Sequence, residues 1–143
     1  KPEHLEVVRN GLVGVVTSGT SARVFAGAGY TSAGKTGTAQ AVTIGQKDKY
    51  NAANLSEYQR DHALYMAYAP ADKPKIAVAV VVENAGFGAA SAAPIARRVF
   101  DYWLLGQYPS EEDMAATQKG QTAGPVGKPR TKQEVPLEPR KLN

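Results

Sequence analysis

Apolar and polar positions along the chain separate helical from extended segments. Residues 2–16 place apolar side chains along one side of a helix, as expected for a surface helix that packs on a core. A short helical segment is predicted over residues 21–25. A second long helix is predicted over residues 91–105, with Ser91 as its cap and Gly106 just past its end. We expect the two long helices to pack together on one face of a sheet.

The periodicity of the second long helix also predicts which of its side chains face the core. The larger apolar side chains are expected to point inward: Ile95, Val99, Tyr102 and Trp103. The two consecutive arginines, Arg97 and Arg98, are expected to point outward, because long charged side chains are rarely buried.

Three segments have the composition of strands, namely residues 35–44, 63–69 and 76–82. The second alternates, with Leu64, Met66 and Tyr68 on one face and smaller residues together with Tyr65 on the other. The third is almost continuously apolar, which suits a strand covered on both faces. A short turn joins these two segments, so they are predicted to form an antiparallel hairpin. The remaining connections, residues 45–61 and 86–90, are interpreted as a long polar loop and a flexible link.

Positive charge is concentrated near the C-terminus. Residues after Met114 contain six Lys or Arg and two Glu, which accounts for the whole net charge of +4. Five of the nine prolines lie beyond Tyr108, among Lys, Gln, Thr and Gly. This composition is typical of disorder, so we predict a folded part over residues 1–106 and a disordered tail over residues 107–143. Because the folded part is neutral overall, we expect no nucleic-acid partner.

Length and composition limit the chemistry further. The chain has 143 residues and no cysteine, so it can form one modest core without disulfides, thiol nucleophiles or cysteine metal sites. We expect no metal and no cofactor. No apolar run approaches the roughly 20 residues that a membrane-spanning helix needs. The chain begins at Lys1 rather than Met, and we expect it to be a piece of a longer protein whose targeting segment lies upstream.

One stretch has a pattern with chemical meaning, GYTSAGKTGTAQAV over residues 29–42. The residues from Gly29 to Thr36 fit the phosphate-binding pattern G-x-x-x-x-G-K-[ST], in which loop amides and a following helix hold phosphates. Lys35, Thr36 and Gly37 also form the K-T-G element of penicillin-recognising enzymes. A third interpretation is a tight turn with an exposed lysine and no chemistry of its own.

The residues that follow Lys35 favour a strand over a phosphate loop. A phosphate loop needs a helix directly after the lysine, and Gly37 and Thr38 are poor residues for a first helical turn. Instead, Thr36 and Thr38 alternate with Gly37 and Ala39, which is a strand pattern. Nucleotide binding through the phosphate-loop pattern is therefore the weaker alternative.

Further segments extend the K-T-G element in a specific order. Gly19, Thr20 and Ser21 are followed by AGKTGTAQ, HALYMAYAP, KIAVAVVVEN and AAPIARRVFDYWL. From Leu5 to Leu105 this series resembles the C-terminal part of the transpeptidase domain of class B penicillin-binding proteins, and among them the penicillin-binding protein 2 group that acts in cell elongation. The resemblance implies an α+β fold with about three of the five antiparallel strands of this penicillin-binding transpeptidase and serine β-lactamase-like fold.

The resemblance also implies an acyl-transfer site. In the family, a serine of an S-x-x-K motif attacks the penultimate D-Ala carbonyl of a peptidoglycan stem peptide and passes the acyl group to an amine of a neighbouring stem. β-Lactams acylate the same serine. By this resemblance Lys35 places positive charge near the nucleophile and the substrate carboxylate. Thr36 and Thr38 offer hydroxyls to that carboxylate, and the Thr38 backbone amide is the second oxyanion donor. Gly37 leaves room for the substrate or the nucleophile's helix.

Two other catalytic motifs of this family are missing from the places where the resemblance requires them. Neither an S-x-x-K pair nor an S-x-N motif is found at a fitting position, so we expect the isolated chain to be inactive. For the longer protein the resemblance implies stem peptides and β-lactams as ligands, and a membrane-embedded glycan polymerase and other elongation proteins as partners. It also implies a place at the periplasmic face of the bacterial inner membrane, anchored by an upstream N-terminal helix.

A function of another class stays open, namely a binding or scaffold module without chemistry. The other chemically attractive side chains are interpreted as structural. His62 begins a strand beside Asp61, and the only other histidine, His4, is distant in sequence. Glu83 and Asn84 end an apolar strand before the glycine-containing link and are expected to shape it.

Overall fold

The structure, a computed structural model, describes residues 1–41, 53, 55–121 and 123–135. The helices are α1 (Pro2–Thr17), α2 (Ala22–Phe25), α3 (Gly88–Ser91), α4 (Ala93–Leu105) and α5 (Glu111–Gln118), and a 3-10 turn, η2, covers Glu57–Gln59. The strands are β1 (Ala33–Ala39), β2 (His62–Ala69) and β3 (Ile76–Val82). These elements confirm the predicted α+β class and the three strands. The prediction extends the first strand to residue 44, but the strand ends at Ala39, within the described part, and residues 42–44 lie outside that part.

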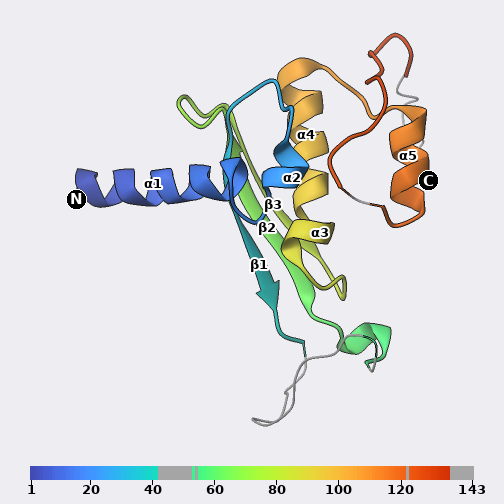
Figure 1. Cartoon of the computed structure of the whole chain (residues 1–143), viewed down its shortest axis with the longest axis horizontal. Helices are drawn as coiled ribbons and strands as arrows, with labels where there is room; N and C mark the ends of the chain where they lie inside the picture. The colour runs from blue at the N-terminus through green and yellow to red at the C-terminus, as the bar shows by residue number, and fades with distance from the viewer. Residues whose placement is uncertain (42–52, 54, 122, 136–143) are drawn as a thin grey trace, which may run out of the picture.

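The strands form one antiparallel sheet in the order β1-β2-β3 (Figure 1). Tyr65 of the central strand β2 lies opposite Thr36 of β1 and Val80 of β3. The alternation predicted for β2 is confirmed. We call the face that contains Tyr65 the inner face and the face that contains Met66, which is 60% exposed, the outer face.

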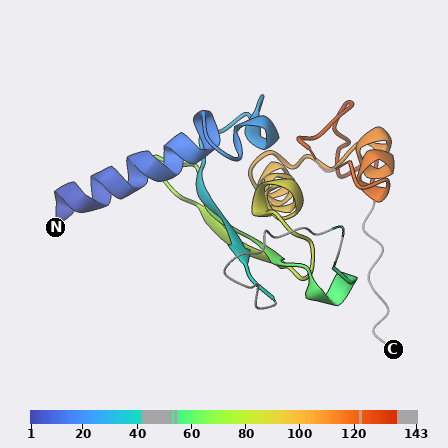
Figure 2. The same ribbon diagram turned by 60° about the horizontal axis from the view of Figure 1, so that its bottom comes forward.

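Helices α3 and α4 cover the inner face of the sheet (Figures 1 and 2). Their buried residues are mostly small, and Phe100 of α4 is the large side chain at the centre. The centroid of its ring lies 6.3 Å from the ring centroid of Phe25 and 6.0 Å from that of Tyr30. Phe25 in turn stacks on Tyr65 at 6.1 Å. The aromatic cluster therefore joins α2, α4 and the sheet.

The predicted inward face of α4 is wrong. The predicted inward residues are at least 37% exposed: Ile95, Val99, Tyr102 and Trp103. The helix instead packs on the sheet through Ala93, Ala96 and Phe100, because small side chains let the helix lie close to the alanines of β2.

The prediction that both arginines of α4 face solvent is also wrong, because each has an acidic partner. Arg97 is 7% exposed and its Nε donates to Asp101 at 2.9 Å, while its Nη1 donates to the carbonyl oxygens of Val24 and Ala26 at the end of α2. Tyr30 donates to the same Asp101 carboxylate at 2.8 Å. Arg97 thus ties α2 to α4 across the core.

The position predicted for α1 needs correction as well. We expected α1 and α4 to pack together on one face, but α1 contacts β1 and α2 and projects away from the sheet (Figure 2). Leu5 and Val8 are 63% and 57% exposed. A Cβ atom built on Gly11 or Gly14 meets nothing within 4 Å, so these glycines make no close helix contact in the described part of the chain.

The segment predicted to be a disordered tail contains ordered structure where it is described. Helix α5 lies beside α4, and Tyr108 and Arg130 form an antiparallel bridge (Figure 1). The sequence-based prediction failed here because composition does not reveal a specific buried partner. Asp113 of α5 is 1% exposed and pairs with Arg98, whose Nε and Nη2 donate to the two carboxylate oxygens at 2.8 and 2.6 Å. The final residues of the predicted tail, 136–143, lie outside the described part.

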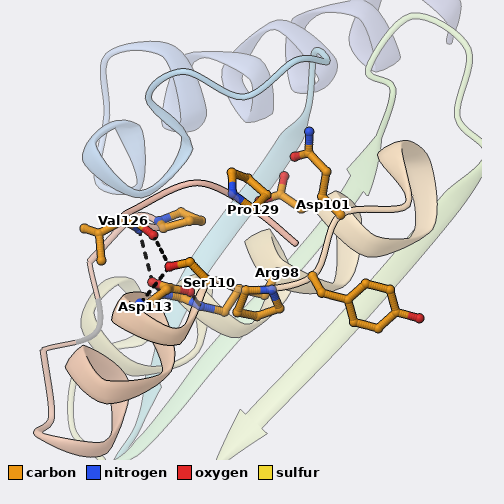
Figure 3. Close-up of a pocket in the computed structure, with 10 residues that line it drawn as sticks. Arg98, Asp101, Ser110, Asp113, Val126 and Pro129 are labelled. Atoms are coloured by element: carbon orange, nitrogen blue, oxygen red, sulfur yellow. Dashed lines mark hydrogen bonds and ion pairs between the residues drawn. The ribbon is translucent and has the colours of Figure 1, made fainter. Parts of the chain in front are cut away.

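A second set of contacts fixes the chain that follows α5 (Figure 3). Ser110 caps α5, since its Oγ accepts from the Asp113 amide at 2.9 Å and donates to the Val126 carbonyl at 2.7 Å. The Val126 amide donates to Asp113 at 3.2 Å. Asp113 therefore connects α4, α5 and the segment around Val126.

We predict that Asp113→Ala releases this C-terminal segment. Loss of one partner of a buried ion pair costs about 3–5 kcal/mol, because the other charge stays buried. The amides of Val126 and Arg130 should lose hydrogen-exchange protection, while those of β2 keep theirs. Glu111→Ala is the matched control, since its side chain is 90% exposed and 3.9 Å from Arg130, so it should change stability by less than about 1 kcal/mol. Unchanged exchange at Val126 in Asp113→Ala contradicts the prediction.

Candidate functional site

The K-T-G residues lie in the middle of β1, which is the edge strand among the described strands. Lys35 pairs with Met66 and its exposed side chain belongs to the outer face, whereas Thr36 and Thr38 pair with Tyr65 and Ala63 of the inner face. This is the strand that the sequence predicts. The phosphate-loop alternative is contradicted, because no helix begins at this lysine.

Polar contacts of the strand involve one residue to which the sequence assigned no role. Thr20, in the turn between α1 and α2, has its Oγ1 3.1 Å from the Oγ1 of Thr36. Lys35 Nζ donates to the Thr36 carbonyl at 2.7 Å. The strand thus offers a pair of adjacent hydroxyls on its inner face and an ammonium group close to the Thr36 backbone, and all three groups can donate hydrogen bonds to a carboxylate. Thr20 stands in the GTS triplet that precedes the motif, so its presence was the available signal.

The glycines of β1 are required by neighbouring side chains of β2. A Cβ atom on Gly37 would lie 3.2 Å from the Cβ of Leu64, and one on Gly34 would lie 2.5 Å from the Tyr65 hydroxyl. The resemblance implies that position 37 is a glycine because a side chain there would take the room of the substrate or of the nucleophile's helix. The described residues add a closer reason, since Leu64 already occupies the space next to it on the outer face.

The buried Tyr65 hydroxyl fixes the strand from the inner face. It lies 3.0 Å from Ser21 Oγ, which also donates to the Val15 carbonyl at 3.2 Å. Burial raises the pKa of Tyr65 above its ordinary value of 10.0, and the Ser21 hydrogen bond opposes that shift. Ser21 thereby links the end of α1 to Tyr65 of β2, which is the residue that pairs with Thr36 of β1. The role of Ser21 is therefore structural.

A second hydrogen-bonded cluster lies at the far end of the hairpin. His62 Nδ1 accepts from the Asn84 amide at 2.9 Å. The Asn84 side chain donates to the carbonyl oxygens of Tyr58 and Arg60 at 3.0 Å, and its φ of 56° lies in the left-handed region. These contacts agree with the structural interpretation of His62 and Asn84, since they fix the connections that flank β2 and β3.

Two features are absent from the part of the chain that the structure describes. Within residues 1–41, 53, 55–121 and 123–135, no group of three or more His, Cys, Asp or Glu residues is arranged to hold a metal ion. Among the helices of the same residues, none combines the length and the apolar character needed to cross a bilayer.

The family is established by comparison with known proteins. The protein-family model of the penicillin-binding protein transpeptidase domain matches residues 1–101 of this chain. The chain belongs to this family.

Curated relatives narrow the similarity within the family. The chain is 46% identical over 109 residues to the peptidoglycan D,D-transpeptidase MrdA of Haemophilus influenzae, which covers 75% of this chain and 17% of that protein. It is 51% identical over 98 residues to the MrdA of Acinetobacter baumannii, covering 68% of this chain and 14% of the relative. The chain therefore spans less than a fifth of the length of either relative.

Solved structures show the same fold similarity. Pseudomonas aeruginosa PBP2, in complex with WCK 5153, is 40% identical with a TM-score of 0.59, over 73% of this chain and 20% of that one. Helicobacter pylori PBP2, in complex with MreC, is 27% identical with a TM-score of 0.57, over 73% and 18%. Penicillin-binding protein A of M. tuberculosis, as a penicillin G acyl-enzyme, is 34% identical with a TM-score of 0.51, over 73% and 21%.

We predict that the free energy of unfolding decreases at alkaline pH because of the buried Tyr65 beside the K-T-G strand. The folded-state pKa of Tyr65 is raised, so above pH 10 the unfolded chain loses the phenolic proton first and unfolding is favoured. The free energy of unfolding should fall by about 1.4 kcal/mol per pH unit for this tyrosine until the pH reaches its folded pKa.

Chemical denaturation between pH 9 and 12 measures this slope. Tyr65→Phe should reduce it, whereas Tyr58→Phe, at a side chain that is 86% exposed, should leave it unchanged. A slope that is equal in the wild type and in Tyr65→Phe contradicts the prediction.

Proposed function

We propose that this chain is the K-T-G part of a peptidoglycan D,D-transpeptidase, which cross-links stem peptides through an acyl-serine intermediate and is acylated by β-lactams. The single observation that supports it most is the K-T-G element at the centre of an edge strand, within a chain that matches the transpeptidase domain over residues 1–101. An edge strand keeps unpaired backbone groups available to a ligand.

In the proposed reaction, a serine outside this chain attacks the penultimate D-Ala carbonyl. A bond forms between the serine oxygen and the carbonyl carbon, and the carbonyl electron pair moves to the oxygen. The serine hydroxyl proton passes to a base outside this chain, and the Thr38 amide donates a hydrogen bond to the oxyanion. When that base gives the proton to the nitrogen of the terminal D-Ala, the electron pair returns from the oxyanion, the C–N bond breaks and D-Ala leaves. An amine of a neighbouring stem then attacks the acyl-serine, which forms the cross-link and releases the serine. A donor that is already in place stabilises the charge of the oxyanion without reorganisation during the reaction.

Recognition of the substrate carboxylate is assigned to side chains of the same strand. Lys35 supplies positive charge, and the hydroxyls of Thr36 and Thr38 donate to the carboxylate. Thr20 is added to this set, because its hydroxyl lies 3.1 Å from that of Thr36 and orients it. Gly37 keeps the peptide between the two threonines free of a side chain.

The proposal extends to the setting of the longer protein. The curated relatives are named as peptidoglycan D,D-transpeptidases, and one structural relative is a complex with MreC. We propose that the longer protein acts at the periplasmic face of the inner membrane with elongation proteins of this kind and with a glycan polymerase as partners.

We predict that Lys35→Ala in the full-length protein lowers the rate of acylation by labelled penicillin about 100-fold, because the site loses its preorganised positive charge. Lys73→Ala is the control, since this exposed lysine lies in the β2–β3 turn and should leave the rate unchanged. A binding or scaffold module without chemistry predicts equal labelling of Lys35→Ala and wild type. That result would reject the transpeptidase function for this motif.

The isolated chain should form no covalent adduct with labelled penicillin, because neither an S-x-x-K pair nor an S-x-N motif of the family lies at a fitting position in it. Denaturing electrophoresis after incubation measures the adduct, with the full-length protein as the positive control. A stable band on the isolated chain shows that a nucleophile within residues 1–143 was overlooked.

A further inference from the structure

Gly88 lies against the backbone of the K-T-G strand. It is the first residue of α3 and is buried. A Cβ atom at this position would overlap the carbonyl oxygen of Leu64, lie 2.7 Å from the carbonyl oxygen of Gly37 and 3.1 Å from the Gly37 amide nitrogen. All three neighbours are backbone atoms of β1 and β2, which cannot rotate aside as the end of a side chain can. The sequence-based interpretation of residues 86–90 as a flexible link is therefore corrected.

The requirement for glycine at position 88 is one of space rather than of backbone conformation. Its neighbour Gly86 has φ of +77°, in the region that favours glycine, whereas Gly88 begins a helix and has no such φ. An alanine at position 88 can therefore adopt the same backbone angles. Its methyl group alone creates the conflict with β1 and β2.

The atom that Gly88 approaches belongs to the peptide unit that carries the proposed oxyanion donor. The Gly37 carbonyl and the Thr38 N–H are parts of one planar peptide group. A displacement of the Gly37 oxygen by a methyl group must therefore tilt the Thr38 N–H as well. The direction of that N–H is the property on which an oxyanion hole depends, because hydrogen bonds weaken steeply when they are misaligned.

Short-range hydrogen bonds join α3 to the residues on either side of it. Ser91 Oγ donates to the Ala85 carbonyl at 2.8 Å, and the Ala92 amide donates to the Gly88 carbonyl at 3.0 Å. Helix α4 follows at once and is packed on the sheet through Ala96. An added methyl group at position 88 would thus strain the contact between α3 and the Gly37 peptide.

We propose that Gly88 is a positioning residue for the oxyanion hole, acting through the Gly37–Thr38 peptide, an inference that rests on the proposed transpeptidase function. Gly88 does not touch the substrate. The close contact of α3 with β1 fixes the direction of the Thr38 amide, and it contributes little to the recognition of the substrate carboxylate by Lys35 and Thr36.

The test measures acylation of the full-length protein by a β-lactam, with the dissociation constant of the first complex separated from the acylation rate constant. Gly88→Ala should lower the rate constant at least about 10-fold, as expected for a misaligned oxyanion donor, and change the dissociation constant less than about threefold. Gly29→Ala is the matched control, because its Cβ would meet only the side chain of Leu105, at 3.4 Å.

A substrate with altered carbonyl chemistry separates positioning from a general loss of structure. Replacing the β-lactam carbonyl oxygen by sulfur gives a weaker hydrogen-bond acceptor. A protein with an intact oxyanion hole is therefore acylated faster by the oxygen compound than by the sulfur compound. Gly88→Ala should reduce this preference, whereas a purely structural defect lowers both rates equally. An unchanged preference in folded Gly88→Ala overturns the proposal.

Two further results keep the outcome clear. If Gly88→Ala fails to give a cooperative melting transition, Ser91→Ala is measured instead. This substitution removes the hydrogen bond from Ser91 to the Ala85 carbonyl, which helps to hold α3 in place, without adding a methyl group at position 88. It should reduce the same preference to a smaller degree, and an unchanged preference again overturns the proposal. Failure of the wild-type full-length protein to acylate, in contrast, rejects the transpeptidase function itself.

Discussion

Close packing of α3 and α4 on the inner face of the sheet is the constraint on which the other features of this structure depend. Alanines of β2 face alanines of α4, and glycine stands where α3 meets the strands. Small residues let backbones approach closely, and the space that remains is filled by the rings of Phe25, Tyr65 and Phe100. The sheet is thereby held from one face, while its outer face stays open in the described residues.

The arginines of α4 follow from the same close packing. A helix that lies so near the sheet brings its flanks into contact with α2 on one side and α5 on the other. Arg97 joins α2 through the carbonyl oxygens of Val24 and Ala26, and Arg98 joins α5 through Asp113. Arg97 is buried and Arg98 is half-buried, and each guanidinium is paired with a carboxylate, which offsets its loss of hydration. The hydrogen bonds and ion pairs of these two arginines thus determine where α2 and α5 lie relative to α4.

The sequence predicts the elements well and their contacts less well, for a physical reason. Helix and strand periodicity depend on local geometry, so the strands, the long helices and the K-T-G element were all found. The inward face of α4 is predicted wrongly because the prediction follows apolar size, whereas small residues decide a close packing. The order around Asp113 was missed because a single buried ion pair between distant residues leaves no trace in composition.

The K-T-G strand presents a mechanical problem that explains where its glycines lie. An amide that is to bind an oxyanion must be unpaired. Among the described strands β1 has β2 as its one neighbour, so only β2 holds it there by backbone hydrogen bonds. A strand with one partner twists and shifts more easily than a central strand. Its direction must then be fixed from its faces, and this requires contacts on the backbone itself. Gly34 and Gly37 bring β1 against Tyr65 and Leu64, and Gly88 brings α3 against the Gly37 peptide from the inner face. Rigidity of the proposed donor thus arises from steric contact where hydrogen bonding cannot provide it.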